Sequence, residues 1–417
     1  CQRSSAGLSS ATASATFKLP PDQASPTFEH ISFARAVRRG LARDGRHLYP
    51  AMPYDAYVGI TDEDIAALYA YFTQGVAPVD AAPGQRTSLA FPFNLRFAMT
   101  GWNLLYAGGD PFTPDPALTE AQNRGRYLVD ALAHCGSCHS PRGLLMGPVR
   151  GAYLTGGDVG PWYAPDITAD AGNGIGTWSP EQIAAYLGTG HAEGRGQAGG
   201  PMAEAVQNSL QHVTDDDLAA MAAYLKTVAP KDAGSGTDAT SFGAPKSDEA
   251  TLRGTHPQNA NDGLTTGAEL FSGYCASCHQ PDGAGSTGQS YPSLFHNSAT
   301  GAASATNLIA AILYGVDRRV GDAHVFMPHF NRGSFVGALS DEEIAGIANY
   351  VLTTWGNAGA ANVTVADVAQ SRQGGPVAPL ARLKPYLPAI MVVGAVVLLF
   401  IIAAMIRLIR DRRRAVA

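Results

Sequence analysis

Two five-residue motifs stand out because their residue types can hold a haem. Residues 135–139 read Cys-Gly-Ser-Cys-His, and residues 275–279 read Cys-Ala-Ser-Cys-His. C-x-x-C-H is the attachment pattern of a c-type haem, in which two thiols bond the haem edge and the adjacent imidazole binds the iron. The chain is therefore predicted to hold two covalently bound haem c groups and to perform one-electron transfer. The residues that would hold them are Cys135, Cys138, His139, Cys275, Cys278 and His279.

Other uses of a C-x-x-C pair fit these motifs less well. A zinc site would need about two further Cys or His ligands near each motif, and no second C-x-x-C lies close to either. A thioredoxin-like dithiol does not need a His in the fifth place, yet His stands there twice. Haem attachment is therefore the favoured interpretation.

A methionine downstream of each motif could supply the sixth iron ligand. Met202 follows the sequence Gly-Gly-Pro, and Met327 lies between Phe and Pro, so both are predicted to lie in loops. Haem iron held by His and Met is typical of electron-carrying cytochromes c, in which Met raises the reduction potential. We therefore expect Met202 and Met327 to bind the irons. The alternative is that one of the scattered histidines takes this place.

Helices must position these motifs, and three similar helix starts recur along the chain. Each has an N-cap residue with an acidic residue three positions later, which is close to a capping box; the caps are Thr61, Thr214 and Ser340. A Tyr lies ten residues after each cap, at Tyr71, Tyr224 and Tyr350. Helices over residues 120–133 and 266–273 are predicted to lead into the motifs and to cross these terminal helices, with the Tyr packed in the crossing.

The first of the three repeats lacks a haem motif. Its loop over residues 48–53 places Met52 where Met202 and Met327 lie in the other repeats, but Cys1 is the only Cys that precedes it. We expect this repeat to be the second half of a cytochrome-like domain whose haem-binding half is missing. Met52 then has no iron to bind.

Length and composition fit several small helical domains. The chain has 417 residues with a formal net charge of −6, so nucleic acid is not an expected partner. Four of its five Cys lie in the motifs, which leaves no disulfide framework. The predicted organisation is a tether (1–18), a truncated haem-less domain (19–110), a haem domain (111–231), a linker (232–257), a second haem domain (258–360), a linker (361–385) and a membrane-spanning helix with a basic tail (386–410).

Both ends of the sequence suggest attachment to a membrane. Residues 387–406 carry no charge and are long enough to span a bilayer. Five Arg follow, and the positive-inside rule would place them in the cytoplasm and the haem domains on the periplasmic face of the inner membrane. A buried core helix is the alternative. Cys1, before a run rich in Ser, Ala and Thr, is typical of a lipid-anchored start; the alternative is a first residue that happens to be Cys.

The chain resembles the multi-haem cytochrome c subunits of membrane-bound alcohol and aldehyde dehydrogenases of acetic acid bacteria, and it is similar to gluconate and fructose dehydrogenase cytochrome subunits. The resemblance runs from about residue 19 to residue 365. It is carried by RHLYPAMPY (46–54), NRGRYLV (123–129), HCGSCHSPR (134–142), GIGTWS (174–179), GGPMAE (199–204) and VFMP (325–328).

The resemblance implies an all-α fold of tandem class I cytochrome c domains, one of them truncated, plus a C-terminal transmembrane helix. It implies that electrons pass from a catalytic dehydrogenase subunit of the molybdenum or PQQ type through the haems to ubiquinone, with a small iron–sulfur subunit in the complex. The family usually has three haems, so the missing first motif is a departure. By resemblance, one haem is served by Cys135, Cys138, His139 and Met202, and the other by Cys275, Cys278, His279 and Met327.

Three other functions stay open from the sequence. A dihaem peroxidase would need an open iron site. A cytochrome of this kind could instead feed a terminal oxidase, and the haem-less repeat could serve chiefly to dock a partner. The sequence has no nucleophile–base pair, P-loop or dinucleotide fingerprint, so we expect organic oxidation to take place on another subunit.

Overall fold

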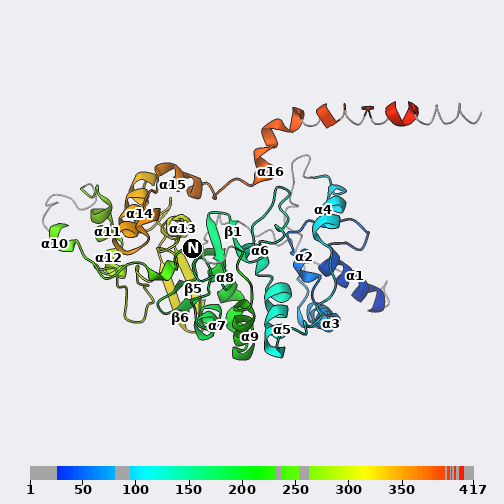
Figure 1. Ribbon diagram of the computed structural model, residues 1–417, viewed down its shortest axis with the longest axis horizontal. Coiled ribbons are helices and arrows are strands. Elements are labelled where there is room, and N and C mark those ends of the chain that lie inside the picture. The colour runs from blue at the N-terminus through cyan, green and yellow to red at the C-terminus, as the bar shows by residue number, and fades with distance from the viewer. Residues whose placement is uncertain are drawn as a thin grey trace, which may run out of the picture. The chain divides into compact units, whose positions relative to one another are not determined.

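The computed structural model describes residues 26–79, 94–231, 236–252, 263–389 and short pieces up to residue 407. It divides into two compact units, one of residues 1–141 with 148–376 and one of residues 142–147 with 377–417. The first unit holds both C-x-x-C-H motifs and all the helices from α1 to α15 (Figure 1). Cys1 and the predicted tether lie outside the described residues, as does part of the first predicted linker (232–257).

The second repeat combines helices with two short hairpins around one core. Its buried centre includes Val129, Leu154 and Met221. In chain order the elements are α5 (Glu120–Tyr127), the π-helical turn η2 (Leu128–Leu132), α6 (Gly136–His139), β1 (Thr155–Val159), β2 (Trp162–Asp166), α7 (Pro180–Thr189), β3 (His191–Ala192), β4 (Gly196–Gln197), α8 (Gly200–Asn208), the 3-10 turn η3 (Leu210–His212) and α9 (Asp215–Leu225).

The first and last helices of this repeat cross closely, as the sequence predicts. Thr119 caps α5 in a capping box, and Thr214 caps α9. A Cβ on Gly125 would lie 1.9 Å from the carbonyl oxygen of Ala220, so the crossing requires glycine. Tyr224 of α9 is buried beside it and donates a hydrogen bond to Asp130 (3.2 Å).

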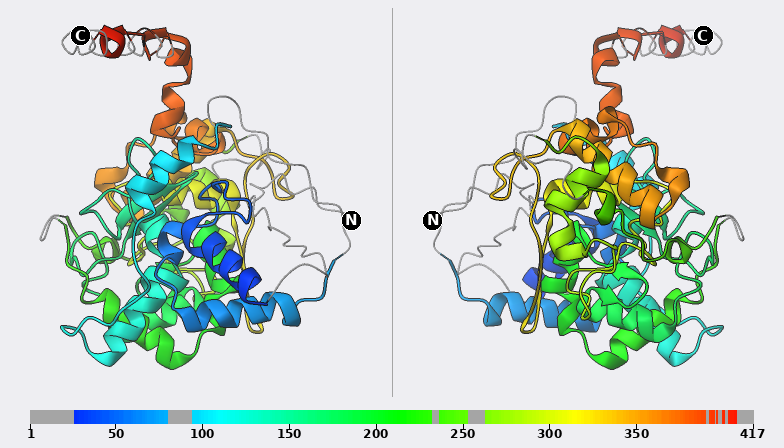
Figure 2. Two further views of the ribbon diagram at one scale, coloured as in Figure 1. Left: turned by 90° about the vertical axis from the view of Figure 1, so that its right-hand side faces the viewer. Right: turned by 90° about the vertical axis from the view of Figure 1, so that its left-hand side faces the viewer.

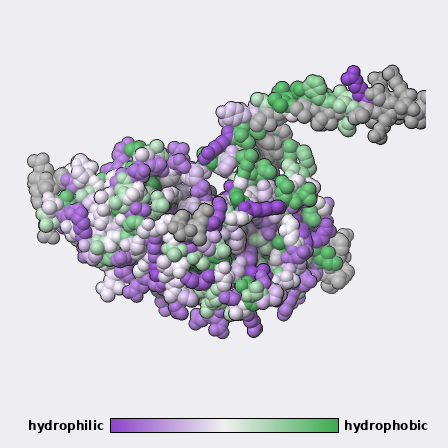
Figure 3. Space-filling view, in the orientation of Figure 1, coloured by the Kyte–Doolittle hydropathy of each residue, from purple (hydrophilic) through white to green (hydrophobic). Residues whose placement is uncertain are grey.

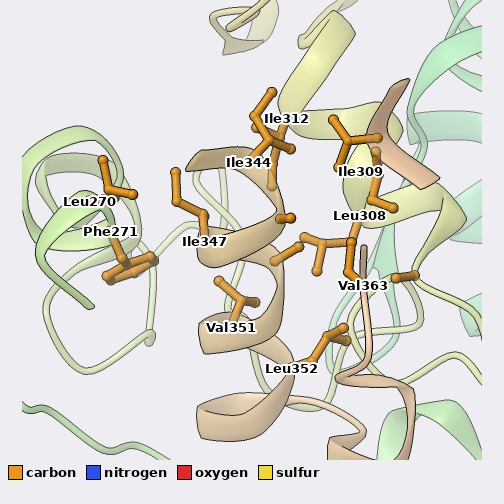
Figure 4. Close-up of a cluster of buried hydrophobic side chains, with 14 of the residues drawn as sticks. Leu270, Phe271, Leu308, Ile309, Ile312, Ile344, Ile347, Val351, Leu352 and Val363 are labelled. Atoms are coloured by element: carbon orange, nitrogen blue, oxygen red, sulfur yellow. The ribbon is translucent and has the colours of Figure 1, made fainter. Parts of the chain in front are cut away.

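The third repeat follows the same plan. Its elements are the 3-10 turn η4 (Ala239–Ser241), α10 (Glu249–Leu252), α11 (Gly267–Tyr274), α12 (Ala276–His279), α13 (Thr306–Tyr314), β5 (Val316–Val320), β6 (Ala323–Met327), α14 (Asp341–Trp355), the 3-10 turn η5 (Ala358–Ala360) and α15 (Val365–Arg372). Figure 4 shows Leu270 of α11 on one side of α14 and Leu308 of α13 on the other. A Cβ on Gly267 would lie 2.2 Å from the oxygen of Gly346, which repeats the close crossing.

The first repeat contains α1 (Pro26–Arg39), α2 (Tyr54–Tyr57), α3 (Asp62–Ala70), the π-helical turn η1 (Tyr71–Gly75) and α4 (Ala98–Tyr106). Ile65 of α3 shares a buried cluster with Tyr127 of α5, and α1 and α3 (blue) lie beside α5 (cyan) in Figures 1 and 2. The predicted packing of Tyr71 in a helix crossing is wrong, because this side chain is 60% exposed. Tyr69 makes the corresponding aromatic contacts, with His30 and Phe33.

The prediction of an all-α fold is also wrong, because three two-stranded antiparallel sheets occur among the described residues. β1 pairs with β2 across Gly160-Pro161, and β5 pairs with β6 across Gly321-Asp322. In each turn the Gly has a positive φ, of 60° and 53°. Such a residue lets a two-residue turn match the twist of the strands, so these hairpins form within otherwise helical repeats.

The predicted C-terminal transmembrane helix needs correction too, together with the inner-membrane location that depended on it. Figure 3 shows the expected apolar residues in this stretch in green. A span requires about 20 consecutive helical residues. The described chain continues into α16 (Pro379–Arg382) and the 3-10 turn η6 (Lys384–Tyr386). Among the described residues, no helix is both long and apolar enough to cross a membrane.

The second and third repeats contact each other through side-chain amides that bind backbone groups. Asn307 of α13 accepts a hydrogen bond from Tyr163 N (2.9 Å) and donates one to Tyr163 O (2.8 Å). Gln207 accepts from Arg319 N (2.7 Å), and Gln211 accepts from Gly321 N (2.9 Å). The β5–β6 hairpin of the third repeat is thereby fixed against α8 and η3 of the second.

The described parts of the two predicted linkers pack against these repeats. In residues 236–252, a Cβ on Gly243 would lie 1.9 Å from the oxygen of Trp355. Asp238 accepts a hydrogen bond from Arg195 of the second repeat (3.4 Å). In residues 361–385, Val368 of α15 is fully buried in the third-repeat core.

Candidate functional site

The first motif occupies the single helical turn α6, and a proline carbonyl orients its histidine. The Nδ1 atom of His139 lies 2.7 Å from the carbonyl oxygen of Pro165 on β2. A carbonyl only accepts, so Nδ1 carries the proton and donates it in this hydrogen bond. The Nε2 lone pair is therefore left for an iron, in the manner of metal-bound histidines whose other nitrogen bonds a backbone carbonyl.

The second motif repeats this arrangement. His279 lies at the end of α12, and its Nδ1 donates to the carbonyl oxygen of Pro292 (3.0 Å). The proline lies 13 residues after His279, but 26 residues after His139 in the first motif. Two segments of different length thus produce the same contact, which fixes the same tautomer twice.

Both imidazoles are suited to binding iron because burial lowers their pKa. A lowered pKa keeps the ring neutral near pH 7, and neutral imidazole is the form that binds metal. The two sites differ in solvent contact: His279 is buried, whereas His139 is half-buried, and protein still surrounds its ring closely enough to lower its pKa. Of the motif residues at this site, Cys138 is exposed. The first site thus presents a cysteine and a histidine that a haem could cover.

Cys135 and Cys275, the first cysteine of each motif, are free thiols. Burial raises the pKa of Cys135 and that of Cys275 to about 12. Reactive cysteines have lowered pKa values instead, so this environment disfavours a redox dithiol. In the part of the chain that the structure describes, no group of three or more His, Cys, Asp or Glu is placed to hold a metal ion. The donor set, two thiols and a neutral imidazole, fits a covalently attached haem.

Met202 lies in the first turn of α8, not in the predicted loop, and is partly buried against the second-repeat core. The Gly-Gly pair before it packs on Trp162: a Cβ on Gly200 would lie 2.4 Å from a ring atom. Trp162 begins β2, the strand that also supplies Pro165. One strand therefore supports both His139 and the segment of Met202.

Met327 ends β6 and is partly buried against the third-repeat core. It pairs with Val316 at the start of β5. The next residue back, Gly315, has a φ of 69°, and a Cβ there would lie 2.4 Å from the oxygen of Met327. The hairpin and this glycine thus fix the position of the methionine.

Aromatic side chains fill the interior of the first repeat. Tyr54, two residues after Met52, is fully buried, and burial raises its pKa to about 12. Its ring touches the backbone of Gly40, where a Cβ would lie 2.5 Å away, and packs edge-on against Trp102 (6.0 Å between centroids). The backbone N–H of Tyr54 also donates to the carbonyl oxygen of Met52 (2.7 Å).

Sequence reasoning missed the supporting residues of both sites. Pro165 and Pro292 act through their carbonyl groups, which any residue has, so residue type gives no signal. The contact of Trp162 with Gly200 joins a hairpin to a helix start, and the hairpin was not predicted. The sequence feature that could have predicted this hairpin is the Gly-Pro pair between two short runs that contain Val, Trp and Tyr.

Comparison with known proteins points to one family. Its profile, described as cytochrome c, matches residues 122–229 and 264–355, and each matched segment contains one C-x-x-C-H motif. The chain is 44% identical over 391 residues to the fructose dehydrogenase cytochrome subunit of Gluconobacter japonicus, covering 92% of this chain and 79% of that protein. It is 34% identical over 362 residues to the gluconate 2-dehydrogenase cytochrome c subunit of Pantoea cypripedii, covering 83% and 77%. Identity is also 34% over 362 residues to the cytochrome c subunit of alcohol dehydrogenase (quinone) of Gluconacetobacter polyoxogenes, covering 84% and 73%.

Proposed function

We propose, because this chain belongs to the family of dehydrogenase cytochrome c subunits, that it carries electrons from a catalytic dehydrogenase subunit to a quinone acceptor. The family resemblance expected from the motifs is confirmed by these relatives. Three of them are named as subunits of fructose, gluconate or alcohol dehydrogenases, and the last name includes quinone. A molybdenum- or PQQ-type partner, an iron–sulfur subunit and ubiquinone as the particular quinone stay predictions.

One observation carries the proposal: the chain builds the same histidine arrangement twice. In each repeat a C-x-x-C-H histidine donates its Nδ1 proton to a proline carbonyl, at 2.7 Å for His139 and 3.0 Å for His279. Each repeat also holds a partly buried methionine downstream, Met202 or Met327. We therefore propose two haem c groups, one that would be held by His139 and Met202 and one by His279 and Met327.

The protein groups would act by holding and tuning. A bound haem supplies one-electron redox chemistry when held by His and Met. The proline carbonyls hold the imidazole rings in one orientation, and methionine sulfur raises the reduction potential. If the His and the Met both bind the iron, as proposed, a substrate would have no free place on it, which favours electron transfer over a peroxidase.

Haem counting and methionine variants test this assignment. A pyridine haemochrome assay should give two haems per chain. Met202→Ala and Met327→Ala should each change the axial ligation of one haem in the absorption spectrum. Met52→Ala is the matched control, since we propose no haem in the first repeat, and its spectrum should equal that of the wild type. Three haems per chain, or a changed Met52→Ala spectrum, would contradict the proposal.

The partner is tested separately by purifying the native complex and identifying the proteins that accompany the chain by mass spectrometry. A dehydrogenase catalytic subunit would support the relay, and its cofactor would identify the type of partner. Subunits of a terminal oxidase in its place would contradict the quinone acceptor.

A further inference from the structure

A buried arginine lies where the second and third repeats meet. Arg318 is on β5 of the third repeat and is only 2% exposed. Its Nη1 donates to the carbonyl oxygen of Ala198 (2.6 Å), and its Nη2 donates to Oε1 of Gln197 (2.5 Å). Both acceptors belong to the second repeat, so the side chain crosses from one repeat into the other.

The backbone of the second repeat is shaped to receive this side chain. Gly190, which follows α7, has a φ of 73°. A Cβ at this position would lie 2.6 Å from Nε of Arg318 and 2.7 Å from Cζ. The guanidinium therefore packs directly on the peptide backbone, where a side chain at residue 190 would displace it.

The charge of Arg318 has no counter-charge among the described residues. Its hydrogen-bond acceptors, an amide and a peptide carbonyl, are neutral, and Nε is buried without a partner. Burial lowers its pKa, but arginine remains protonated at neutral pH. Buried charges are ordinarily paired, because an unpaired one costs several kcal/mol in effective desolvation. An uncancelled cation in this setting acts over a longer range than a surface charge.

Arg318 contacts a residue close in sequence to each of the two proposed methionine ligands. Ala198, whose oxygen Arg318 binds, precedes Met202 by four residues. On the other side, Arg318 pairs with Val325 in the hairpin, and Val325 precedes Met327 by two residues. The guanidinium is therefore connected to the Met segment of each repeat by a few residues.

We infer that Arg318 tunes the reduction potentials of the two haems, raising them by its uncancelled positive charge. This inference rests on the proposed haem ligation. A fixed positive charge favours the reduced state, since ferric iron carries one more positive charge than ferrous iron. Arg318 touches no reacting atom and acts only through this field.

The test is a spectroelectrochemical titration of the full-length holoprotein and three variants. Arg318→Met removes the charge and keeps an apolar side chain of similar length. Gln197→Glu leaves Arg318 in place and puts a carboxylate beside Nη2. Arg319→Met is the matched control, because this neighbouring arginine is exposed.

Both charge-cancelling variants should lower the midpoint potential of at least one haem. The expected shift is about tenfold in the ratio of reduced to oxidised haem at a fixed potential, or ~59 mV for one electron. Arg319→Met should titrate like the wild type. Unchanged potentials in both Arg318→Met and Gln197→Glu would overturn the inference. A shift accompanied by altered axial ligation in the absorption spectrum would also overturn it, because Arg318 would then have a structural role.

The experiment distinguishes failure of the proposed haem ligation from failure of the proposed charge effect. If Arg318→Met does not fold, Gln197→Glu decides the question, because it retains the buried arginine. If Met202→Ala and Met327→Ala leave the spectrum unchanged, the proposed ligation fails irrespective of the Arg318 result. The ligation is thus tested by spectra, and the charge by potentials.

Discussion

The close crossing of α5 and α9 lets us predict how much a substitution there lowers the free energy of unfolding. In Gly125→Ala, the added Cβ would lie 1.9 Å from the oxygen of Ala220 and 2.9 Å from Cβ of Tyr224. The first of these neighbours is backbone and has no rotamer that could move away, so the helices must separate. Overpacking of this kind costs about 1–3 kcal/mol, and a backbone clash puts Gly125→Ala at the upper end. Alanine regains about 1 kcal/mol of helix propensity, which leaves a net loss of ~2 kcal/mol.

The assay is urea unfolding followed by far-UV circular dichroism and by haem absorbance. The two probes are compared because a chain with several repeats need not unfold in one step. Gly101→Ala is the matched control: Gly101 lies inside α4, and a Cβ there meets nothing within 4 Å. The control should be neutral or slightly stabilising. Equal unfolding midpoints for the two variants would refute the proposed backbone clash.

Three further changes have expected outcomes. Gly267→Ala should lower the free energy of unfolding by about 2 kcal/mol, because its Cβ would lie 2.2 Å from Gly346 O. The haem absorbance lost first on unfolding should be that of the third repeat. An unchanged urea midpoint would contradict this prediction. Trp355→Ala should cost about 3–5 kcal/mol, since the side chain is fully buried and donates to Lys246 O (3.0 Å). In Asp217→Asn the effect should depend on pH. Hydrogen bonds from Arg124 (2.7 Å) hold the pKa of Asp217 below its usual value, so its stabilisation is present above pH ~4 and is lost as the pH falls through the lowered pKa. The variant should be up to about 1 kcal/mol less stable at pH 7 and equal to the wild type in strong acid; a difference that persists in acid would count against the ion pair.

The sequence predicted the helix starts well because their signals are local. A capping residue and an acid three positions later identified the starts of α3, α9 and α14, and the structure has Thr61, Thr214 and Ser340 as their caps. The β1–β2 and β5–β6 hairpins were missed because their strands are short and only a Gly-Pro or Gly-Asp turn marks them. Tyr71 was misplaced because spacing after a cap does not say which face of a helix is covered.

The sequence predicted the anchoring residues of the candidate sites but not the residues that support them. C-x-x-C-H identifies the anchoring residues because the chemistry requires those side chains at that spacing. The proline carbonyls behind His139 and His279 have no side-chain signature. Arg318 looks like one of two adjacent arginines, and only the fold distinguishes the buried residue from its exposed neighbour. Contacts between repeats arise from tertiary structure, so a single sequence gives no local signal for them.

The amide contacts between the second and third repeats limit how the two repeats can evolve. Asn307, Gln207 and Gln211 bind only backbone groups of the opposite repeat. The side chains at positions 163 and 319 can therefore drift in evolution without breaking this interface, whereas the three amides cannot. Exchange of either repeat alone with a distant relative would separate the amides from the backbone shapes they fit. The two repeats should thus descend as a pair, and chimaeras that join repeats of two distant parents at residues 236–252 should fail to form this interface.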